Sequence, residues 1–320
     1  MIGGLVTLDL GTGSASSLFT TLLACAVPAF AGGLAEDVTR RVSVGTRLLL
    51  TFVAAGIGFF LLDARITAVD VPGVDSLLGF SACSFAFTLF AVGGFANAMN
   101  IVDGFNGLAG AIALIYVAAI AYVAHAVGDG QLALACLLLG AAMAGFLIFN
   151  YPRGLVFLGD GGAYAIGFMI AELAVLLVQR NSSVSPWFAL TLFVYPAWET
   201  FFSIYRKKVV RRMSPGQPDG LHLHMLVHKR LVRRAVRKWP HRVFWENALT
   251  SPFLWALALL GVVPAVLFWD TTWALELSAG VFVIFYCLLY RRLVRFGTLG
   301  GKLIQSMARR AKRRGEAVGG

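Results

Sequence analysis

Charged residues are scarce in this chain of 320 residues: Asp, Glu, Lys and Arg make up 13% of it, against 58% hydrophobic residues. The mean hydropathy is +0.78. A water-soluble domain has too little interior to bury so much apolar surface, so the composition excludes an ordinary soluble fold. We therefore expect an all-α polytopic integral membrane protein that forms one multi-span domain over residues 1–320.

Cysteine and histidine are also rare, with four and five residues respectively. The cysteines lie singly in apolar stretches, and none belongs to a Cys-x-x-Cys pair. This pattern argues against a disulfide framework and against a cysteine-based metal site. The polar chemistry of the chain must therefore come from carboxylates, amides and a few histidines.

Nine apolar stretches are long enough to cross a bilayer as helices, for which about 17–25 residues are needed. They cover residues 17–34, 46–62, 77–97, 106–126, 131–149, 161–179, 187–205, 249–268 and 273–290. We expect about nine transmembrane helices with short connections. The exceptions are a long basic loop at 206–248 and a basic tail at 291–320.

The positive charges fall on one side of this predicted bundle. Twelve of the 27 Lys and Arg residues lie within 206–242, nine lie within 291–314, and four more lie in loops on the same side if the helices alternate. Loops rich in Lys and Arg face the cytoplasm. We therefore place these loops and the C-terminus in the cytoplasm. Anchoring to an anionic membrane explains the net charge of +11, so it does not call for a nucleic-acid partner.

The most polar interruption is Asn97-Ala-Met-Asn100-Ile-Val-Asp103-Gly-Phe-Asn106, where one apolar stretch gives way to the next. Its four polar side chains recur every three residues, so a helix would carry them on nearly one face. Amide and carboxylate oxygens suit a hard cation or the hydroxyl groups of a sugar. We interpret this motif as a binding site; a polar helix end capped by Asn is the alternative.

Two acidic clusters lie in other predicted cytoplasmic loops. Glu36 and Asp37 end the first apolar stretch, where adjacent carboxylates either bind a cation, act as a base, or simply face solvent. Phe157-Leu-Gly-Asp160-Gly-Gly precedes the sixth stretch, and its glycines expose amide groups that favour phosphate at a helix start. Asp160 would repel a bare phosphate, so a Mg²⁺ ion between the two explains the pairing. A Gly-rich turn with an Asp cap is the alternative.

The long basic loop holds His222 and His224, with Arg211 and Arg212 upstream. Histidine and arginine together suit a pyrophosphate. A basic helix lying on anionic lipid is the alternative, and the loop lacks the fuller His and Cys spacing of a zinc site.

Two acids fall inside predicted spans, where a carboxyl group is a candidate for function by default. Glu172 lies near the middle of the sixth span, and we interpret it as a residue that pairs helices. Glu199 lies near the cytoplasmic end of the seventh span, where it is placed to support the site.

In this order, the clusters resemble those of the polyprenyl-phosphate N-acetylhexosamine-1-phosphate transferases (glycosyltransferase family 4), over roughly residues 33–230. The His-Leu-His pattern is closer to the undecaprenyl-phosphate GlcNAc-1-phosphate transferases than to the phospho-N-acetylmuramoyl-pentapeptide transferases, whose loop usually has three consecutive histidines. The resemblance implies catalytic roles for Glu36, Asp37, Asp103 and Asp160, with Mg²⁺, or Mn²⁺ in its place, on Asp160. It implies substrate binding by Asn97, Asn100, Asn106, Phe157, Arg211, Arg212, His222 and His224.

The implied reaction transfers a sugar 1-phosphate, GlcNAc 1-phosphate by default, from a UDP-N-acetylhexosamine to undecaprenyl phosphate and releases UMP. It would be the first membrane step in the synthesis of O-antigen, lipopolysaccharide or another cell-envelope glycan. The resemblance also implies a place in the inner membrane of a bacterium. Members of this family are often homodimers. The muramoyl-pentapeptide reaction stays open. So do a non-catalytic relative that binds the lipid carrier, and a transporter.

Three positions depart from the family pattern: Glu36 replaces an aspartate, Asn106 stands where many members have Asp, and Met225 stands where a third histidine often lies. Family members usually carry at least one more N-terminal helix, followed by a Pro-Arg-Gly-Gly-like loop. Met1-Ile-Gly-Gly-Leu resembles the end of that loop. We therefore expect either that the start codon is assigned too late or that this chain is naturally shorter than its relatives.

Overall fold

The computed structural model describes residues 13–214, 220–238 and 241–316. Within these residues the chain is helical almost throughout and forms no β-strand. Eight of the described helices are long and apolar enough to cross a membrane. The predicted all-α, multi-span class is therefore confirmed. The predicted difference from the family at the N-terminus concerns residues 1–12, which lie outside the described residues.

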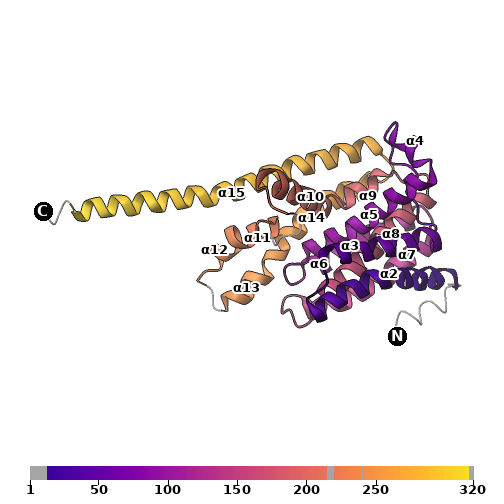
Figure 1. The fold of residues 1–320 in the computed structure, drawn as a ribbon, viewed down its shortest axis with the longest axis horizontal. Coiled ribbons are helices and arrows are strands. Elements are labelled where there is room, and N and C mark those ends of the chain that lie inside the picture. The colour runs from indigo at the N-terminus through magenta and orange to yellow at the C-terminus, as the bar shows by residue number, and fades with distance from the viewer. Residues whose placement is uncertain (1–12, 215–219, 239–240, 317–320) are drawn as a thin grey trace.

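The helices lie roughly along one direction and form a bundle (Figure 1). The long ones are α2 (Gly13–Thr39), α3 (Val44–Leu61), α5 (Ser81–Val102), α6 (Leu108–Ala126), α7 (Gly130–Asn150), α8 (Gly159–Arg180), α14 (Thr250–Leu267) and α15 (Thr272–Glu316). The short ones are α4 (Val74–Leu78), α9 (Trp187–Leu192), α10 (Val194–Tyr205), α11 (Leu223–Val227), α12 (Arg233–Ala235) and α13 (Arg242–Ala248). Two π-helical turns, η1 (Arg206–Val210) and η2 (His228–Val232), complete the long loop.

Helix α8 is the centre of the bundle, and it packs against α2, α5, α6 and α3. Most of its side chains are buried, from Ala163 to Leu177. A Cβ atom on Gly167 would lie 2.9 Å from the Cα atom of Ala96 on α5, so the two helices approach closely at this glycine. The close approach matters because α5 and α8 carry the predicted Asn/Asp and Gly-Asp motifs.

The predicted span 187–205 is divided into α9 and α10, which meet at Phe193. Pro196 explains the break: it has no N–H group to donate to the carbonyl of Leu192, and its ring crowds that carbonyl. Before α9, the amide of Ser185 donates to the carbonyl of Trp269 at one end of the bundle. On α10, Glu199 contacts the histidine loop at the other end. The segment therefore still crosses the bundle, but as two short helices instead of the single helix predicted.

The last predicted span, 273–290, and the basic tail that follows it lie in one helix, because α15 runs from Thr272 to Glu316. Figure 1 shows its C-terminal part projecting beyond the bundle.

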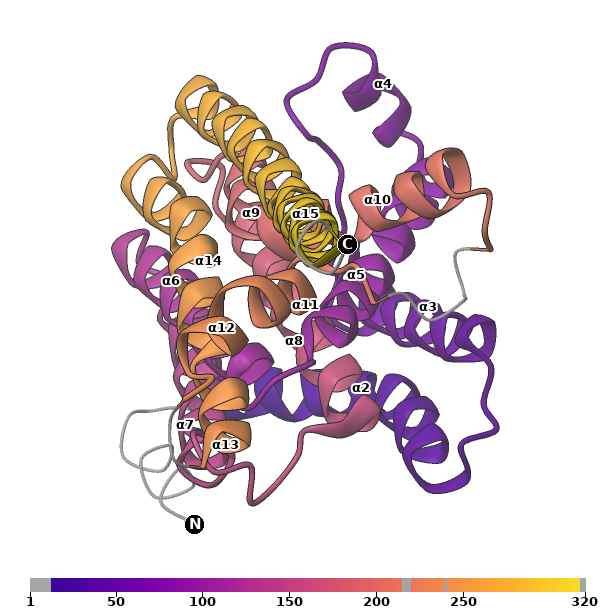
Figure 2. The same cartoon turned by 90° about the vertical axis from the view of Figure 1, so that its left-hand side faces the viewer.

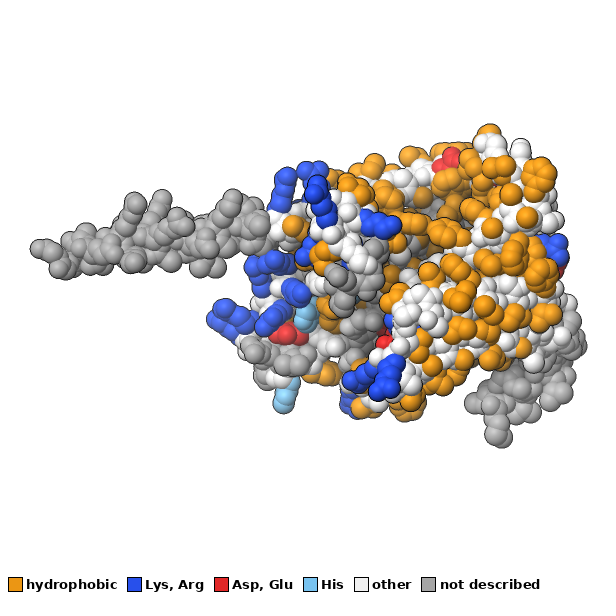
Figure 3. Space-filling view, in the orientation of Figure 1, with side chains coloured by type: hydrophobic (Ala, Val, Ile, Leu, Met, Phe, Trp, Pro, Cys, Tyr) orange, Lys and Arg blue, Asp and Glu red, His pale blue; other side chains and the backbone are white. Residues whose placement is uncertain are grey.

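The two ends of the bundle are chemically different. Figure 2 looks onto the end that carries α10, α11, α12 and α13. Most Lys and Arg side chains visible in Figure 3 gather at this end, and hydrophobic side chains dominate the rest of that face. The charge asymmetry of the sequence is therefore an asymmetry of the folded molecule.

Candidate active site

The first turn of α8 is capped by Asp37 from the end of α2. One carboxylate oxygen of Asp37 accepts a hydrogen bond from the amide of Asp160 at 2.9 Å, and the other accepts one from the amide of Gly161 at 3.0 Å. A carboxylate at a helix N-terminus satisfies unpaired amides and interacts favourably with the helix dipole. These two amides therefore bind Asp37, whereas the sequence interpretation left them open to phosphate.

Two glycines allow Asp37 to reach this position. A Cβ atom on Gly33 of α2 would lie 2.5 Å from the backbone of Asp160. Gly159 has a φ of +68°, and a Cβ atom there would lie 2.6 Å from the carboxylate of Asp37. Because neither position has room for a side chain, the glycines of α2 and of the α8 start fix the contact between the two helices.

The Asp160 side chain is held from two other helices. Arg47 of α3 forms an ion pair with its Oδ2 atom, and the Asn100 side-chain amide donates to its Oδ1 atom at 2.8 Å. One turn earlier on α5, the Oδ1 atom of Asn97 accepts a hydrogen bond from the Tyr164 hydroxyl at 3.3 Å. Both asparagines therefore face α8, which agrees with the shared helical face that their spacing predicted.

Arg47 is a site residue that the sequence indicated only as one of the positive charges on the predicted cytoplasmic side. It is largely buried, with a side-chain exposure of 13%, and its guanidinium lies 6.0 Å from the ring centre of Tyr164. Its position in the sequence could have indicated this role, because Arg47 is the only basic residue in the apolar sequence of α3. A buried arginine needs a partner, and an acidic motif elsewhere in the chain was the obvious source.

Asp103 lies just beyond the end of α5, where the negative charges of Asp160 and Asp37 act on its carboxyl group. Burial, followed by the negative charges of Asp160 and Asp37, raises its pKa from 3.8 to about 7. Three acidic side chains thus influence one another here, and Arg47 offsets one negative charge. The remaining excess of negative charge favours binding of a cation.

The donor chemistry of this cluster fits a magnesium ion. Carboxylate oxygens of Asp160 and Asp103 are the hard donors that Mg²⁺ prefers, and Mg²⁺ commonly takes only one or two protein carboxylates, with water and substrate phosphate completing its shell. Among the residues that the structure describes, no three His, Cys, Asp or Glu side chains are already grouped as metal ligands. A cation at Asp160 would share the carboxylate with Arg47 and Asn100, because each carboxylate oxygen has a second lone pair.

The histidine loop reaches this cluster from the C-terminal half of the chain. A Cβ atom on Gly104 would lie 3.1 Å from the Nε2 atom of His224, so this imidazole packs on the backbone beside Asp103. The rings of His222 and His224 are parallel, with their centroids 5.4 Å apart. Burial lowers the pKa of His224 to about 4, which keeps its ring neutral near neutral pH. The fold thus joins the histidine motif to the Asn/Asp motif.

Glu36 and Asn106 hold loops in place. Glu36 accepts a hydrogen bond from the amide of Val42 at 2.8 Å, which closes the turn between α2 and α3. The Asn106 side chain donates to the carbonyl of Pro152 at 3.1 Å, and its backbone amide donates to the side chain of Asn247 at 2.8 Å. Their predicted roles in catalysis and substrate binding stay predictions, and the structure gives both residues a local task as well.

The other predicted substrate-binding residues are open to solvent. Phe157 lies on the loop before α8, and 75% of it is exposed. Arg211 and Arg212 are exposed just after η1. All three are accessible to a ligand, and their roles also stay predictions.

Glu172 of α8 is fully buried, and neither of its carboxyl oxygens has a hydrogen-bond partner among the described residues. It packs against Gly58 of α3, where a Cβ atom would lie 2.4 Å from Oε1. This contact fits the interpretation of Glu172 as a residue between helices, and it separates Glu172 from the carboxylate cluster.

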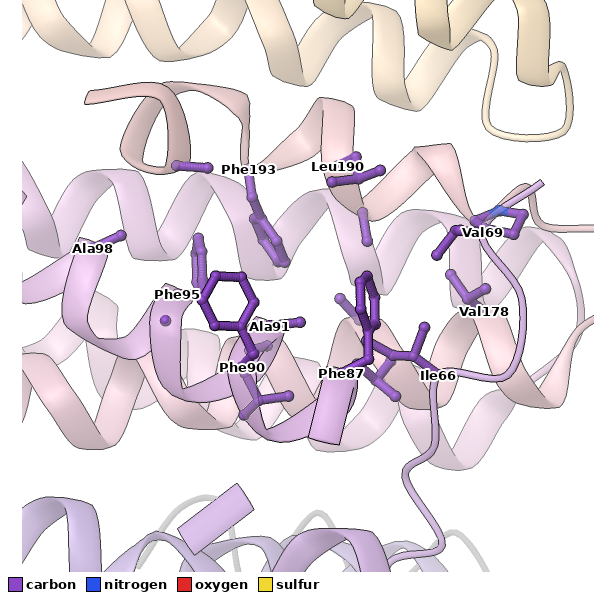
Figure 4. Close-up of a pocket in the computed structure, with 18 of the residues that line it drawn as sticks. Ile66, Val69, Phe87, Phe90, Ala91, Phe95, Ala98, Val178, Leu190 and Phe193 are labelled. Atoms are coloured by element: carbon purple, nitrogen blue, oxygen red, sulfur yellow. The ribbon is translucent and has the colours of Figure 1, made fainter. Parts of the chain in front are cut away.

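An apolar cavity of about 720 Å³ lies beside the cluster, bounded by α3, α5, α8, α9 and α10 (Figure 4). Leu48, which follows Arg47 in sequence, and Asn97 line it near the cluster, while Arg65 and Asp70 line it at the other end of α5. Several apolar lining residues are also exposed on the surface of the bundle: Phe90, Leu190, Phe201 and Ile204. The cavity therefore opens sideways, on the apolar surface of the bundle.

Comparisons with known proteins agree with these motifs. The family model described as glycosyl transferase family 4 matches residues 19–178, half of the chain, and this region contains Asp37, the Asn/Asp motif and Asp160. The phospho-N-acetylmuramoyl-pentapeptide-transferase of Streptococcus equi subsp. zooepidemicus is 29% identical over 231 residues, which cover 68% of this chain. The undecaprenyl-phosphate alpha-N-acetylglucosaminyl 1-phosphate transferase of Escherichia coli K12 is 33% identical over 148 residues, which cover 45% of this chain and 40% of that protein. The match to the streptococcal protein spans 64% of that protein's length.

Proposed function

Because the chain belongs to glycosyl transferase family 4, we propose that it transfers an N-acetylhexosamine 1-phosphate from a UDP-sugar to undecaprenyl phosphate and releases UMP. GlcNAc 1-phosphate is the proposed group, supported by the similarity to the Escherichia coli transferase and by the His222-Leu-His224 pattern. The second candidate is transfer of the muramoyl-pentapeptide 1-phosphate, which the longer match to the streptococcal protein favours.

The observation that carries the proposal is the place of the carboxylate cluster at the end of an apolar cavity. Asn97 links the two: it lines the cavity, and its amide oxygen accepts the hydrogen bond of Tyr164, which lies about one helical turn after Asp160 on α8. A polyprenyl chain in the cavity would therefore bring its phosphate to the cluster. A polar site joined to an apolar cavity suits a substrate that is itself half lipid and half phosphate.

The proposed chemistry needs little help from a base. An oxygen of the lipid phosphate attacks the β-phosphorus of the UDP-sugar, and the bond from that phosphorus to the bridging oxygen breaks so that UMP leaves. A phosphate monoester is already mostly ionised near neutral pH, because its second pKa is about 6. When bound, Mg²⁺, or Mn²⁺ in its place, would neutralise charge on the pyrophosphate. Asn100 fixes the Asp160 carboxylate, and Arg47 supplies positive charge beside it.

The roles of the other acids follow from their contacts. Asp37 binds two backbone amides, so we propose that it holds the start of α8 and the Asp160 side chain in position. Asp103, with its pKa raised to about 7, is the acid best suited to exchange a proton near neutral pH.

We further propose that the chain lies in the inner membrane of a bacterium, with the cluster and the C-terminus on the cytoplasmic side, where the nucleotide-sugar is. The concentration of Lys and Arg at that end of the bundle supports this orientation. The reaction would then begin the synthesis of O-antigen, lipopolysaccharide or another envelope glycan. A homodimer and bound membrane lipid complete the proposed state, and nucleic acid has no part in it.

The test is release of UMP by the purified protein in detergent, with undecaprenyl phosphate, Mg²⁺ and UDP-GlcNAc. Asp160→Asn should lower the rate at least about 100-fold, because an amide holds a divalent cation more weakly than a carboxylate does, and the cation is what would neutralise charge on the pyrophosphate. Asp270→Asn, an exposed acid between α14 and α15, is the matched control and should keep the rate of the parent.

The donor that supports turnover decides between the candidates. Release from UDP-N-acetylmuramoyl-pentapeptide and not from UDP-GlcNAc would favour the second candidate. Binding of undecaprenyl phosphate or a nucleotide-sugar without release of UMP from any UDP-N-acetyl sugar would identify a non-catalytic relative. An unchanged rate in Asp160→Asn would remove this residue from the site.

A further inference from the structure

Glu199 of α10 is a fully buried carboxylate that receives hydrogen bonds from three directions. The Tyr286 hydroxyl of α15 donates to its Oε2 atom at 2.5 Å, and the amide of Leu223 donates to its Oε1 atom at 3.2 Å. The Nδ1 atom of His222 lies 2.9 Å from the same Oε1 atom. A buried carboxylate is tolerated when its oxygens accept such bonds, so this environment suits the ionised form.

The backbone on both sides of His222 is also fixed. Before it, the carbonyl of Leu221 accepts a hydrogen bond from the Tyr290 hydroxyl of α15 at 3.1 Å. Arg206 in turn donates to the oxygen of Tyr290 at 2.9 Å. After it, the amide of Leu223 is bound to Glu199. Because the main chain is held at both neighbours, rotation of its own side chain is the main freedom that His222 keeps.

The contact with Glu199 determines which ring nitrogen of His222 carries the proton and which one is left for a ligand. An ionised carboxylate can only accept, so Nδ1 of His222 is the protonated nitrogen in this pair. Nε2 makes no hydrogen bond to any described residue. The ring lies parallel to that of His224, which packs beside Asp103. Nε2 is therefore the ring nitrogen of His222 left for a ligand at the carboxylate cluster.

We propose that Glu199 is a positioning residue: its carboxylate binds the Nδ1–H group of His222 and thereby presents Nε2 of that ring to the UDP-sugar. The ligand named here rests on the proposed function, whereas the Glu199–His222 pair does not. Glu199 itself lies behind the histidine, fully buried. Its partner on α15, Tyr286, lies outside the region matched by the family model, so the last helix would contribute to the site through this carboxylate.

The kinetic test is a double-mutant cycle on UMP release, with the UDP-sugar concentration varied. Glu199→Gln keeps the length of the side chain and an oxygen that still accepts from Leu223. Glu199→Gln and His222→Ala should each lower kcat/KM about 10- to 100-fold, as loss of a group behind a functional histidine commonly does. The double variant should be no worse than His222→Ala, because Glu199 acts through His222. Glu199→Asp should recover part of the loss.

Two controls separate positioning from folding. Thermal unfolding of each variant reports whether the bundle survives, and Glu276→Gln removes an exposed acid of α15 that should leave kcat/KM unchanged. If Glu199→Gln lowers kcat/KM by the same factor with and without His222, Glu199 has a general structural role and the proposal is overturned. The proposed function stands in that case, because the parent protein still releases UMP.

A spectroscopic test does not depend on turnover. In the whole protein labelled with ¹⁵N-histidine, the His222 signals are assigned by their loss in His222→Ala. We expect Nδ1 of His222 to carry a proton; an unprotonated Nδ1 overturns the proposal. If the parent protein releases no UMP from any donor while Nδ1 is protonated, the proposed function fails and the Glu199–His222 pair stands.

Discussion

His224 shows at the residue scale how burial decides the charge of a side chain. It is 3% exposed and packs against Gly104, and burial is the first cause of its lowered pKa. Asp103 lies in the same region, and burial moves its pKa in the opposite direction. In both cases the neutral form is favoured, since a low-dielectric surrounding penalises the charged form of either group.

The lowered pKa of His224 predicts a loss of stability in acid. Its folded-state value of about 4 lies below the 6.5 of the unfolded chain, so protonation favours unfolding. The stabilising effect is complete above pH 6.5 and falls as the pH drops toward 4, by about 2 kcal/mol at pH 5. His224→Gln, which does not titrate, should lose less thermal stability than the parent between neutral pH and about pH 5.

Thermal unfolding followed by tryptophan fluorescence at the two pH values measures this difference. His125→Gln, an exposed histidine near the end of α6, is the control and should behave as the parent does. Equal acid sensitivity in His224→Gln and the parent would show that His224 is not the group responsible.

At the element scale, the site depends on how closely α2 and α8 cross. Gly33 lies against backbone atoms of Asp160, and backbone atoms cannot rotate out of the way as a side chain could. Gly33→Ala should therefore separate the helices, at a cost of about 1–3 kcal/mol in stability. Because the same movement draws Asp37 away from the amides of α8, we expect kcat/KM for UMP release to fall at least about 10-fold.

Gly145→Ala on α7 is the matched control, since a Cβ atom there meets nothing within 4 Å. It should leave turnover unchanged and stability equal or higher, because Ala favours a helix over Gly by about 1 kcal/mol. Full activity in Gly33→Ala would mean that the α2–α8 contact does not set the position of Asp37.

The sequence predicted the spans well because hydropathy and length decide them, and it predicted the face shared by Asn97 and Asn100 because helical periodicity is local. It did not predict contacts that depend on packing between distant helices. The capping of α8 by Asp37, the ion pair of Arg47 and the anchoring of Asn106 all join residues far apart in the chain. The break at Phe193 was readable in Pro196, but an apolar stretch of spanning length concealed it.

At the scale of the whole molecule, the charge asymmetry predicts how the protein lies in a membrane. Residues on opposite ends should differ in access from outside the cell. In intact spheroplasts, a membrane-impermeant maleimide should label a Ser76→Cys variant, in α4, and should label a Lys208→Cys variant, in η1, only after lysis. Both positions are exposed in the structure.

The parent protein, with its four native cysteines, gives the background labelling. If Lys208→Cys were labelled in intact spheroplasts and Ser76→Cys were protected, the protein would have the opposite orientation in the membrane. That orientation would place the carboxylate cluster away from cytoplasmic nucleotide-sugars, and the proposed reaction would then lack its donor.

The sideways opening of the apolar cavity between α5 and α10 bears on how the protein would meet the proposed acceptor, undecaprenyl phosphate. A lipid that enters there never leaves the bilayer, so it diffuses in two dimensions and arrives already oriented. The encounter rate would then follow the number of acceptor molecules per unit area of membrane and not their number per unit volume. Inert phospholipid added at constant acceptor would slow the reaction by surface dilution, and growth of the cell envelope would itself dilute the acceptor.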